Sequence, residues 1–462
     1  MLVVRFLDRG TPLADRLSNR VRRPAGLLWA LWFGILAPPF RTVANLALAN
    51  VNWWQRVSAL EAFLWMAVPL FVVWILSARW FAGTVRVLRF AVLLLGFCIF
   101  WTRPGLVVDS MTHQPRDQAS FIKPLPAPAA PHQRIVWVLF DEMSYDQVFV
   151  HRFPGLQLPN LDKLRAESTT FSGMDPDGRF TEDVIPSILL GVPIDQVRGT
   201  RSGWMIYQSR RNGPWLRFQG SQTLFASAQL DGWTTGVVGE FNPYCRVLRD
   251  QLDSCWMSLP PLPNDLSRDN STLGNLFAPL TGAWNRQFHR KQPAPPGPQT
   301  VDILSSVAAG DALIRDSAID LCLVHLPFPH PPGDYNRNTG RIGPGGTYID
   351  NLALSDRILG HILAEIAQSP DAGRTTLILS SDHSWRTWLW RGRFDWTPEE
   401  EAASRHGYFD PRPMLMVRFP GQTTPDTVSR PVPLLAMHQL VERIMGGQIE
   451  SQQQLLAWAA EQ

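Results

Sequence analysis

The chain has 462 residues, a formal net charge of +3 and 18% charged residues, while 45% of its residues are hydrophobic and 19 are tryptophan. This length suits one large domain and a further part. Residues 1–100 contain eleven Arg, no Lys and three acidic residues, so this segment carries +8 and the remainder −5. A basic, apolar front before a mildly acidic remainder indicates a membrane anchor and a soluble domain. Because no run of Lys and Arg alternates with aromatic residues outside this anchor, a nucleic-acid binder is excluded.

Three long apolar runs occupy the first hundred residues, at 25–40, 57–78 and 87–101. The second run has one charged residue and is long enough to cross a bilayer, so a soluble helix explains it poorly. A cleaved signal peptide is also a poor explanation, because the first run starts late and other runs follow. We therefore predict a basic segment at 1–23 and about three transmembrane helices within 24–101.

The arginines predict the orientation of these spans. Six precede the first run, and three more lie around the junction of the second and third. Both groups are expected in the cytoplasm under the positive-inside rule. Three spans that start in the cytoplasm place everything after Trp101 outside. The sequence thus predicts a protein of a bacterial-type inner (plasma) membrane, with a cytoplasmic N-terminus and an extracytoplasmic, periplasmic domain.

A proline-rich stretch at 124–131 is typical of a stiff, extended spacer, and we predict a linker at 102–133. The remaining residues, 134–462, form the predicted extracytoplasmic domain. It opens with Arg134–Glu142, a continuous apolar run that ends in two acids, as a buried parallel strand does. In open α/β folds, the carboxyl ends of such strands carry the functional sites.

Similar strand-like runs recur along the domain and alternate with helical patterns. The strand-like runs are Thr234–Gly239, Ala318–His325, Arg374–His383 and Met414–Phe419, and the helical patterns include Leu161–Ser168, Leu224–Leu230 and Asn351–Gln368. This alternation predicts an α/β fold with a mostly parallel sheet flanked by helices.

Two cysteines, Cys245 and Cys255, lie close together in a polar stretch. In an extracytoplasmic domain they could form a disulfide, and the alternative is two free thiols. The sequence leaves both open.

The stretch Phe180–Gly191 consists of a short polar turn and an apolar helical run that stops at a glycine. A hydroxyl at the start of such a helix faces unpaired backbone N–H groups and the positive end of the helix dipole. This environment favours an oxyanion, so Thr181 suits a nucleophile or a phosphate-binding group. The alternative is that Thr181 is the N-cap of the helix, with two acidic residues in the first turn.

Two strand ends carry residues that ligate metals. Asp141 ends one apolar run, and Asp382 and His383 end another. Two carboxylates and an imidazole indicate a divalent metal site, for which zinc is the first choice and calcium, magnesium and manganese are alternatives. If Thr181 joins this site, coordination lowers the pKa of its hydroxyl and makes it a nucleophile at neutral pH. The alternative is that Asp141 and Glu142 are ordinary polar residues at a strand end.

Five motifs between Arg134 and Gly421 follow one another in a characteristic order. They are FDE at 140–142, PNLDKLRAESTTFSG at 159–173, TEDVIPSILLG at 181–191, HLPFPHPP at 325–332 and LILSSDHSW at 377–385. In this order they resemble the sulfatase-like branch of the alkaline phosphatase superfamily. The resemblance implies that superfamily's fold, a mostly parallel sheet flanked by helices.

The resemblance also aligns Thr181 with the residue that sulfatases modify to an aldehyde hydrate. Sulfatases have Pro two residues later and Arg four residues later, whereas this chain has Asp183 and Ile185. A threonine cannot form that modified group, which argues against a standard sulfatase. An unmodified threonine is similar to the membrane phosphoethanolamine transferases, lipoteichoic acid synthases and nucleotide phosphodiesterases of the same superfamily. In the first two, membrane spans also precede an extracytoplasmic domain.

Carried over residue by residue, the resemblance implies a metal site and a set of catalytic residues. The implied metal ligands are Asp141, Glu142, Thr181, Asp382 and His383, and the implied catalytic residues are Thr181, His330 and His406. His330 could instead be a loop histidine held by prolines, and His406 a surface residue. Two departures stand out, since Glu240 lies near the place of a substrate-binding lysine and Ser384 replaces the usual glycine. Because no second set of ligands is evident, we expect one metal ion.

The sequence thus predicts a membrane-bound, metal-dependent transferase or hydrolase of phosphate esters that forms a covalent phospho-Thr181 intermediate. Its expected substrate is a membrane lipid or an envelope glycan. Two rivals remain: a hydrolase of sulfate esters, and a module that keeps the fold but binds an envelope partner without catalysis. The donor, the acceptor and the oligomeric state are left open.

Overall fold

The computed structural model describes residues 120–124, 133–199, 205–258, 298–393 and 396–462. The predicted transmembrane region at 24–101 lies outside these ranges. Within them, no helix is both long enough and apolar enough to span a bilayer.

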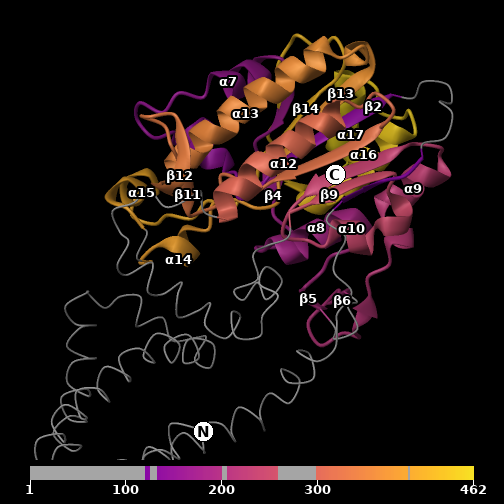
Figure 1. Ribbon diagram of the computed structural model, residues 1–462, viewed down its shortest axis with the longest axis horizontal. Coiled ribbons are helices and arrows are strands. Elements are labelled where there is room, and N and C mark those ends of the chain that lie inside the picture. The colour runs from indigo at the N-terminus through magenta and orange to yellow at the C-terminus, as the bar shows by residue number, and fades with distance from the viewer. Residues whose placement is uncertain (1–119, 125–132, 200–204, 259–297, 394–395) are drawn as a thin grey trace, which may run out of the picture. The chain divides into compact units, whose positions relative to one another are not determined.

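A nine-stranded sheet forms the centre of the described part, with the strand order β1-β9-β8-β10-β2-β13-β14-β3-β15 (Figure 1). Strands β1 and β14 run opposite to the other seven, which confirms the prediction of a mostly parallel sheet. The strands are β1 (Ser120–Ile122), β2 (Arg134–Phe140), β3 (Thr169–Phe171), β8 (Thr235–Gly239), β9 (Ser254–Met257), β10 (Leu321–Leu326), β13 (Thr375–Ser381), β14 (Leu415–Arg418) and β15 (Asp426–Val428).

Strand β2 lies in the middle of this sheet, and all seven of its residues are buried. Trp137 and Leu139 face one hydrophobic cluster, and Val136 and Val138 face another. The first cluster includes residues of α8 (Thr181–Leu190), α9 (Leu224–Leu230), α16 (Met437–Met445) and α17 (Gln452–Glu461). The second includes residues of α7 (Pro159–Ala166), α12 (Pro298–Arg315) and α13 (Tyr348–Gln368). Helices therefore cover both faces of the sheet, and α12 and α13 lie side by side in Figure 1.

Shorter elements surround the sheet. They are the helices α10 (Tyr244–Val247), α14 (Thr387–Trp390) and α15 (Pro398–Ala403), the pair β11 (Gly333–Asn336) and β12 (Arg341–Gly346), the pair β4 (Met174–Asp175) and β16 (Val432–Pro433), and the three strands β5 (Gln196–Gly199), β6 (Met205–Gln208) and β7 (Leu216–Arg217).

Strand β1 lies within the range that we predicted as a linker, 102–133, and pairs with β9. The sheet therefore begins before Arg134. Next to β1, Cys245 of α10 and Cys255 of β9 form a disulfide with their Cα atoms 5.6 Å apart. The structure thus selects the paired alternative for these two cysteines.

Candidate functional site

The carboxyl ends of β2 and β13 bring two predicted ligands together. These strands are parallel neighbours with Phe140 opposite Ser381, so Asp141 and Asp382 leave the sheet side by side. Both side chains are buried. This is the arrangement that the two apolar runs predicted, because parallel strands end at the same edge of a sheet.

Thr181 reaches the same point from the start of α8. Phe180 is the N-cap and has an extended backbone, so Thr181 is the first helical residue and not the cap. Its hydroxyl donates a hydrogen bond of 2.8 Å to Asp382 Oδ2 and lies 3.3 Å from His383 Nε2. Thr181 is only 4% exposed. The hydroxyl is therefore committed to the carboxylate cluster and does not cap the helix.

The imidazole of His383 completes this cluster. Its Nε2 lies 3.1 Å from Asp382 Oδ2 and 3.7 Å from Asp141 Oδ1. Its Nδ1 lies 3.2 Å from the carbonyl oxygen of Ser384. When Nδ1 donates to that carbonyl, Nε2 presents a lone pair to the cluster, as a metal-ligating histidine does.

The donor set fits a divalent cation. Asp141 Oδ1 is buried and has no hydrogen-bond partner. Burial, together with the neighbouring Asp382 and Glu142 carboxylates, raises the pKa of Asp141 well above its usual range. One ligand atom each from Asp141, Glu142 and His383 lies within 4.8 Å of the others. A bound cation would supply the missing partner of Asp141 and offset the negative charge of the carboxylates.

Glu142 also lies in this cluster, and its carboxylate oxygens already accept several hydrogen bonds. Its carboxylate accepts hydrogen bonds from Arg386 N, Nε and Nη2 at 2.7, 3.1 and 3.0 Å, and from Trp390 Nε1 at 2.8 Å. Burial would raise the pKa of Glu142, but His330 and Arg386 outweigh it and lower that pKa. In addition to its predicted role as a ligand, Glu142 therefore forms a buried ion pair that connects β2 to the loop after β13.

His330 borders the cluster, and its Nε2 lies 3.6 Å from Glu142 Oε2. Its ring meets that of Trp390 edge to face, with 5.1 Å between the ring centroids. Burial lowers the pKa of His330, although the Glu142 carboxylate opposes this effect. In its neutral form the ring carries a hydrogen on one nitrogen, which it can donate.

The structure does not bring His406 into this cluster. Its side chain is 83% exposed, and its Nδ1 lies 3.4 Å from Glu401 Oε1. Its backbone has a positive φ of 63° in the turn formed by residues 404–407. Of the seven predicted site residues, His406 is the one that faces solvent, in agreement with the alternative that the sequence left open.

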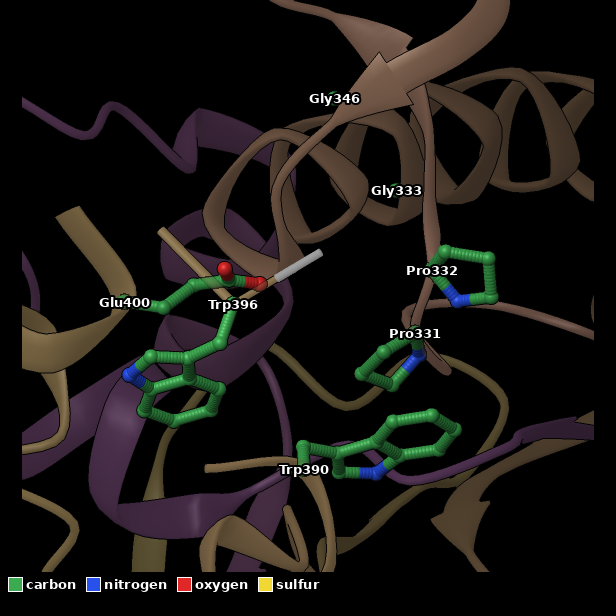
Figure 2. Close-up of a pocket in the computed structure, with 7 residues that line it drawn as sticks. All are labelled: Pro331, Pro332, Gly333, Gly346, Trp390, Trp396 and Glu400. Atoms are coloured by element: carbon green, nitrogen blue, oxygen red, sulfur yellow. The ribbon is translucent and has the colours of Figure 1, made fainter. Parts of the chain in front are cut away.

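A small hollow lies behind Trp390 (Figure 2). Its volume is about 10 Å³, which is enough for roughly one water molecule. Figure 2 shows Trp390 next to Pro331, with Trp396 and Glu400 on another side. The hollow adjoins the site through Trp390 but is too small to hold a substrate.

Sequence reasoning missed three residues near the cluster: Arg386, Trp390 and His325. His325 lies on β10, next to β2, and its Nδ1 is 2.9 Å from the hydroxyl of Tyr244. Its Nε2 is buried without a hydrogen-bond partner, and burial lowers the pKa of His325 to about 4. A signal existed for two of them, since His325 nearly ends an apolar run and Arg386 lies four residues after Asp382.

Comparisons with known proteins give similar structures only. No protein-family model matches the chain, and no curated protein does. A sulfatase from Pseudoalteromonas sp. is 13% identical, with 68% of each chain covered and a TM-score of 0.44. A protein of the alkaline phosphatase superfamily from Vibrio parahaemolyticus is 17% identical, with 69% of this chain and 68% of that one covered and a TM-score of 0.43. The lipoteichoic acid synthase LtaP from Listeria monocytogenes is 12% identical, with 68% of this chain and 72% of that one covered and a TM-score of 0.42.

These structures belong to the enzyme groups that the sequence motifs resemble: sulfatases, the alkaline phosphatase superfamily and a lipoteichoic acid synthase. At these identities and TM-scores, the similarity assigns no substrate, reaction or residue role to this chain. The roles of the clustered residues therefore have to be argued from their own geometry.

Proposed function

We propose that this chain is a membrane-bound, metal-dependent transferase or hydrolase of phosphate esters that acts on an envelope lipid or glycan through a covalent phospho-Thr181 intermediate. One observation carries the proposal. A threonine hydroxyl is buried at the start of a helix and donates to Asp382 at 2.8 Å, beside a second carboxylate with an unpartnered oxygen. A purely structural hydroxyl needs one hydrogen-bond acceptor, whereas Thr181 lies beside two buried carboxylates, those of Asp382 and Asp141.

The ligands that would hold the cation are Asp141, Asp382 and His383, with Thr181 and Glu142 as further donors. Zinc suits the imidazole best. When bound, the cation would supply positive charge that lowers the pKa of the Thr181 hydroxyl and draws charge from the phosphoryl oxygens.

The residues of the chain perform the remaining steps. Thr181 Oγ1 forms a bond to phosphorus while the bond from phosphorus to the leaving oxygen breaks. The hydroxyl proton, which is hydrogen-bonded to Asp382 Oδ2, is passed to the leaving oxygen, so that the leaving group departs as a hydroxyl compound. The N–H groups and dipole at the start of α8 stabilise negative charge at this point. His330 in its neutral form donates a hydrogen bond to an oxygen that does not take part in the exchange.

The second step releases the group from Thr181. A hydroxyl of an acceptor, or water, attacks the phosphorus, and the bond to Thr181 Oγ1 breaks. The proton of the attacking hydroxyl passes to Thr181 Oγ1, which restores the threonine. Transfer and hydrolysis differ only in the attacking oxygen.

Two features support an extracytoplasmic place for this chemistry. The apolar runs and flanking arginines of residues 1–101 predict three spans with a cytoplasmic start. The Cys245–Cys255 disulfide is of a kind that persists in oxidising compartments such as the periplasm. A substrate in the outer leaflet or the envelope would be accessible to a domain placed there.

Replacement of the proposed nucleophile tests this function. The full-length chain is assayed in detergent with zinc, on an aryl phosphate, a bis-aryl phosphate and an aryl sulfate. We expect turnover of a phosphate ester and a loss of roughly a thousandfold or more in Thr181→Ala, because removal of a nucleophile abolishes the covalent route. The zinc content should stay unchanged, and acid quenching of the parent should leave a phosphate on the peptide with Thr181.

Thr397→Ala is the matched control, because Thr397 is a threonine whose hydroxyl also contacts a carboxylate, that of Glu400, but only as a helix N-cap. It should keep full activity. Undiminished turnover in Thr181→Ala would refute the covalent scheme. Preference for the aryl sulfate would favour the sulfate-ester alternative.

A further inference from the structure

An aromatic pair stands directly beside the proposed nucleophile. Phe180 precedes Thr181, and its ring meets that of Trp388 edge to face, with 6.2 Å between centroids and 85° between planes. Trp388 belongs to α14, which follows the loop that carries Asp382 and Arg386. The same two segments that build the cluster therefore also build this pair.

Trp388 is more open to solvent than the other tryptophan of α14. It is 45% exposed, whereas Trp390 of the same short helix is 7% exposed. The guanidinium of Arg179 lies 6.0 Å from the centre of the Trp388 ring, within the range of a cation–π contact. A partly exposed indole with a cation over its ring therefore lies between the segments that carry Thr181 and Asp382.

A second cation holds the inner member of this pair. The guanidinium of Arg386 lies 5.5 Å from the Phe180 ring, and Arg386 Nη1 donates to the carbonyl oxygen of Arg179 at 3.4 Å. Because Arg386 is also bonded to Glu142, the aromatic pair is fixed relative to the cluster. The surface is therefore built into the site and does not belong to a separate loop.

We propose that Phe180, Trp388 and Arg179 form an outer subsite for a pyranose ring esterified to the reacting phosphate. A pyranose has a flat C–H face that packs on an indole, and hydroxyls that accept hydrogen bonds from a guanidinium. A glycerol headgroup has the hydroxyls but no flat face. This inference rests on the proposed function, and it selects a sugar phosphate from the envelope substrates that the proposal allows.

Binding to an inactive chain tests the subsite. Full-length Thr181→Ala, supplied with zinc, is titrated calorimetrically with inorganic phosphate, glycerol 3-phosphate and glucose 1-phosphate. We expect glucose 1-phosphate to bind about three- to tenfold more tightly than glycerol 3-phosphate, the range for one aromatic contact. Adding Trp388→Ala should reduce this ratio to about one and leave the affinity for inorganic phosphate unchanged.

Trp215→Ala in the same background is the matched control, since Arg198 of β5 lies over the ring of Trp215, just before β7, at 4.4 Å. It should keep the preference for glucose 1-phosphate. Equal affinities for the two esters before Trp388 is changed, or a preference that survives its removal, would overturn the inference alone. Failure of all three ligands to bind would instead count against the proposed function.

Discussion

Two adjacent carboxylates, Asp141 and Glu142, are buried at the end of β2 and are compensated in different ways. Glu142 has a guanidinium and an indole N–H bonded to its oxygens. Asp141 has one oxygen with no partner, and its pKa is raised because burial and two neighbouring carboxylates oppose its charge. The chain thus provides the counter-charge for Glu142 itself, whereas the counter-charge for Asp141 is the part that the proposed cation would supply.

The ion pair of Glu142 and Arg386 predicts a large effect on stability. Both side chains are buried, so Arg386→Ala would leave a buried charge with few partners. We expect a loss of about 3–5 kcal/mol in the free energy of unfolding, measured by denaturant titration. Arg386→Lys should recover only part of this loss, because an ammonium cannot reproduce the two-pronged contact.

The exposed pair of Arg315 and Glu365 provides the control for that measurement. The Arg315 side chain is 57% exposed, so Arg315→Ala should change stability far less than Arg386→Ala does. Similar losses in Arg386→Ala and Arg315→Ala would contradict the buried, structural role of Arg386.

For single residues, the sequence was sufficient to predict the position of those that directly follow a buried strand or begin a helix. Asp141, Asp382 and His383 follow long apolar runs whose ends meet at one sheet edge, so their meeting could be predicted. His406 and Arg386 lie in the loops after β13, where position depends on the path of the chain and on long-range contacts. The sequence could not show that Arg386 turns inward to Glu142 and that His406 turns outward to solvent.

Among the elements, α8 determines where the Thr181 hydroxyl lies. Its C-terminal cap is Gly191, which has a positive φ of 67°. A Cβ atom added there would lie 2.6 Å from the ring of His438, whose Nδ1 is 2.9 Å from the carbonyl oxygen of Ile188. A glycine is therefore favoured at this position for two reasons: the left-handed backbone and the close approach of α16.

We therefore expect Gly191→Ala to lower the free energy of unfolding by more than the cost of the left-handed backbone alone. A left-handed alanine costs roughly 1–2 kcal/mol, and overpacking adds roughly 1–3 kcal/mol. Gly155→Ala is the control, because Gly155 has a φ of 83° and no atom within 4 Å of an added Cβ. Denaturant titration should show the larger loss in Gly191→Ala, and equal losses would contradict the packing argument.

The predicted elements agree with the structure where the apolar runs are long. The predicted runs Arg134–Glu142 and Arg374–His383 contain β2 and β13, and the predicted helix Asn351–Gln368 covers all of α13 except its first three residues. The three-residue strand β1 was missed because so short a segment shows no periodicity. Ile122 of β1 is 79% exposed, so the strand has little apolar pattern to detect.

At the scale of the whole molecule, the described domain has its own two-sided core and a complete cluster at one sheet edge. In the sequence, a basic, apolar segment precedes this domain, and its charges predict on which side of the membrane the domain lies. The Cys245–Cys255 disulfide lies within the domain, and its formation depends on the compartment as well as on geometry. Its redox state in cells therefore reports on the predicted orientation.

Thiol labelling after denaturation, without reductant, measures that orientation. The chain has four cysteines, and export of the domain should leave two free thiols, those of Cys98 and Cys322. A variant that lacks residues 1–101 should stay in the cytoplasm, where reducing systems keep thiols reduced, and should show three free thiols from residues 245, 255 and 322. Adding reductant to the full-length sample should raise its count from two to four. Four free thiols without reductant would place the domain in the cytoplasm and refute the predicted topology, whereas two would agree with an extracytoplasmic site.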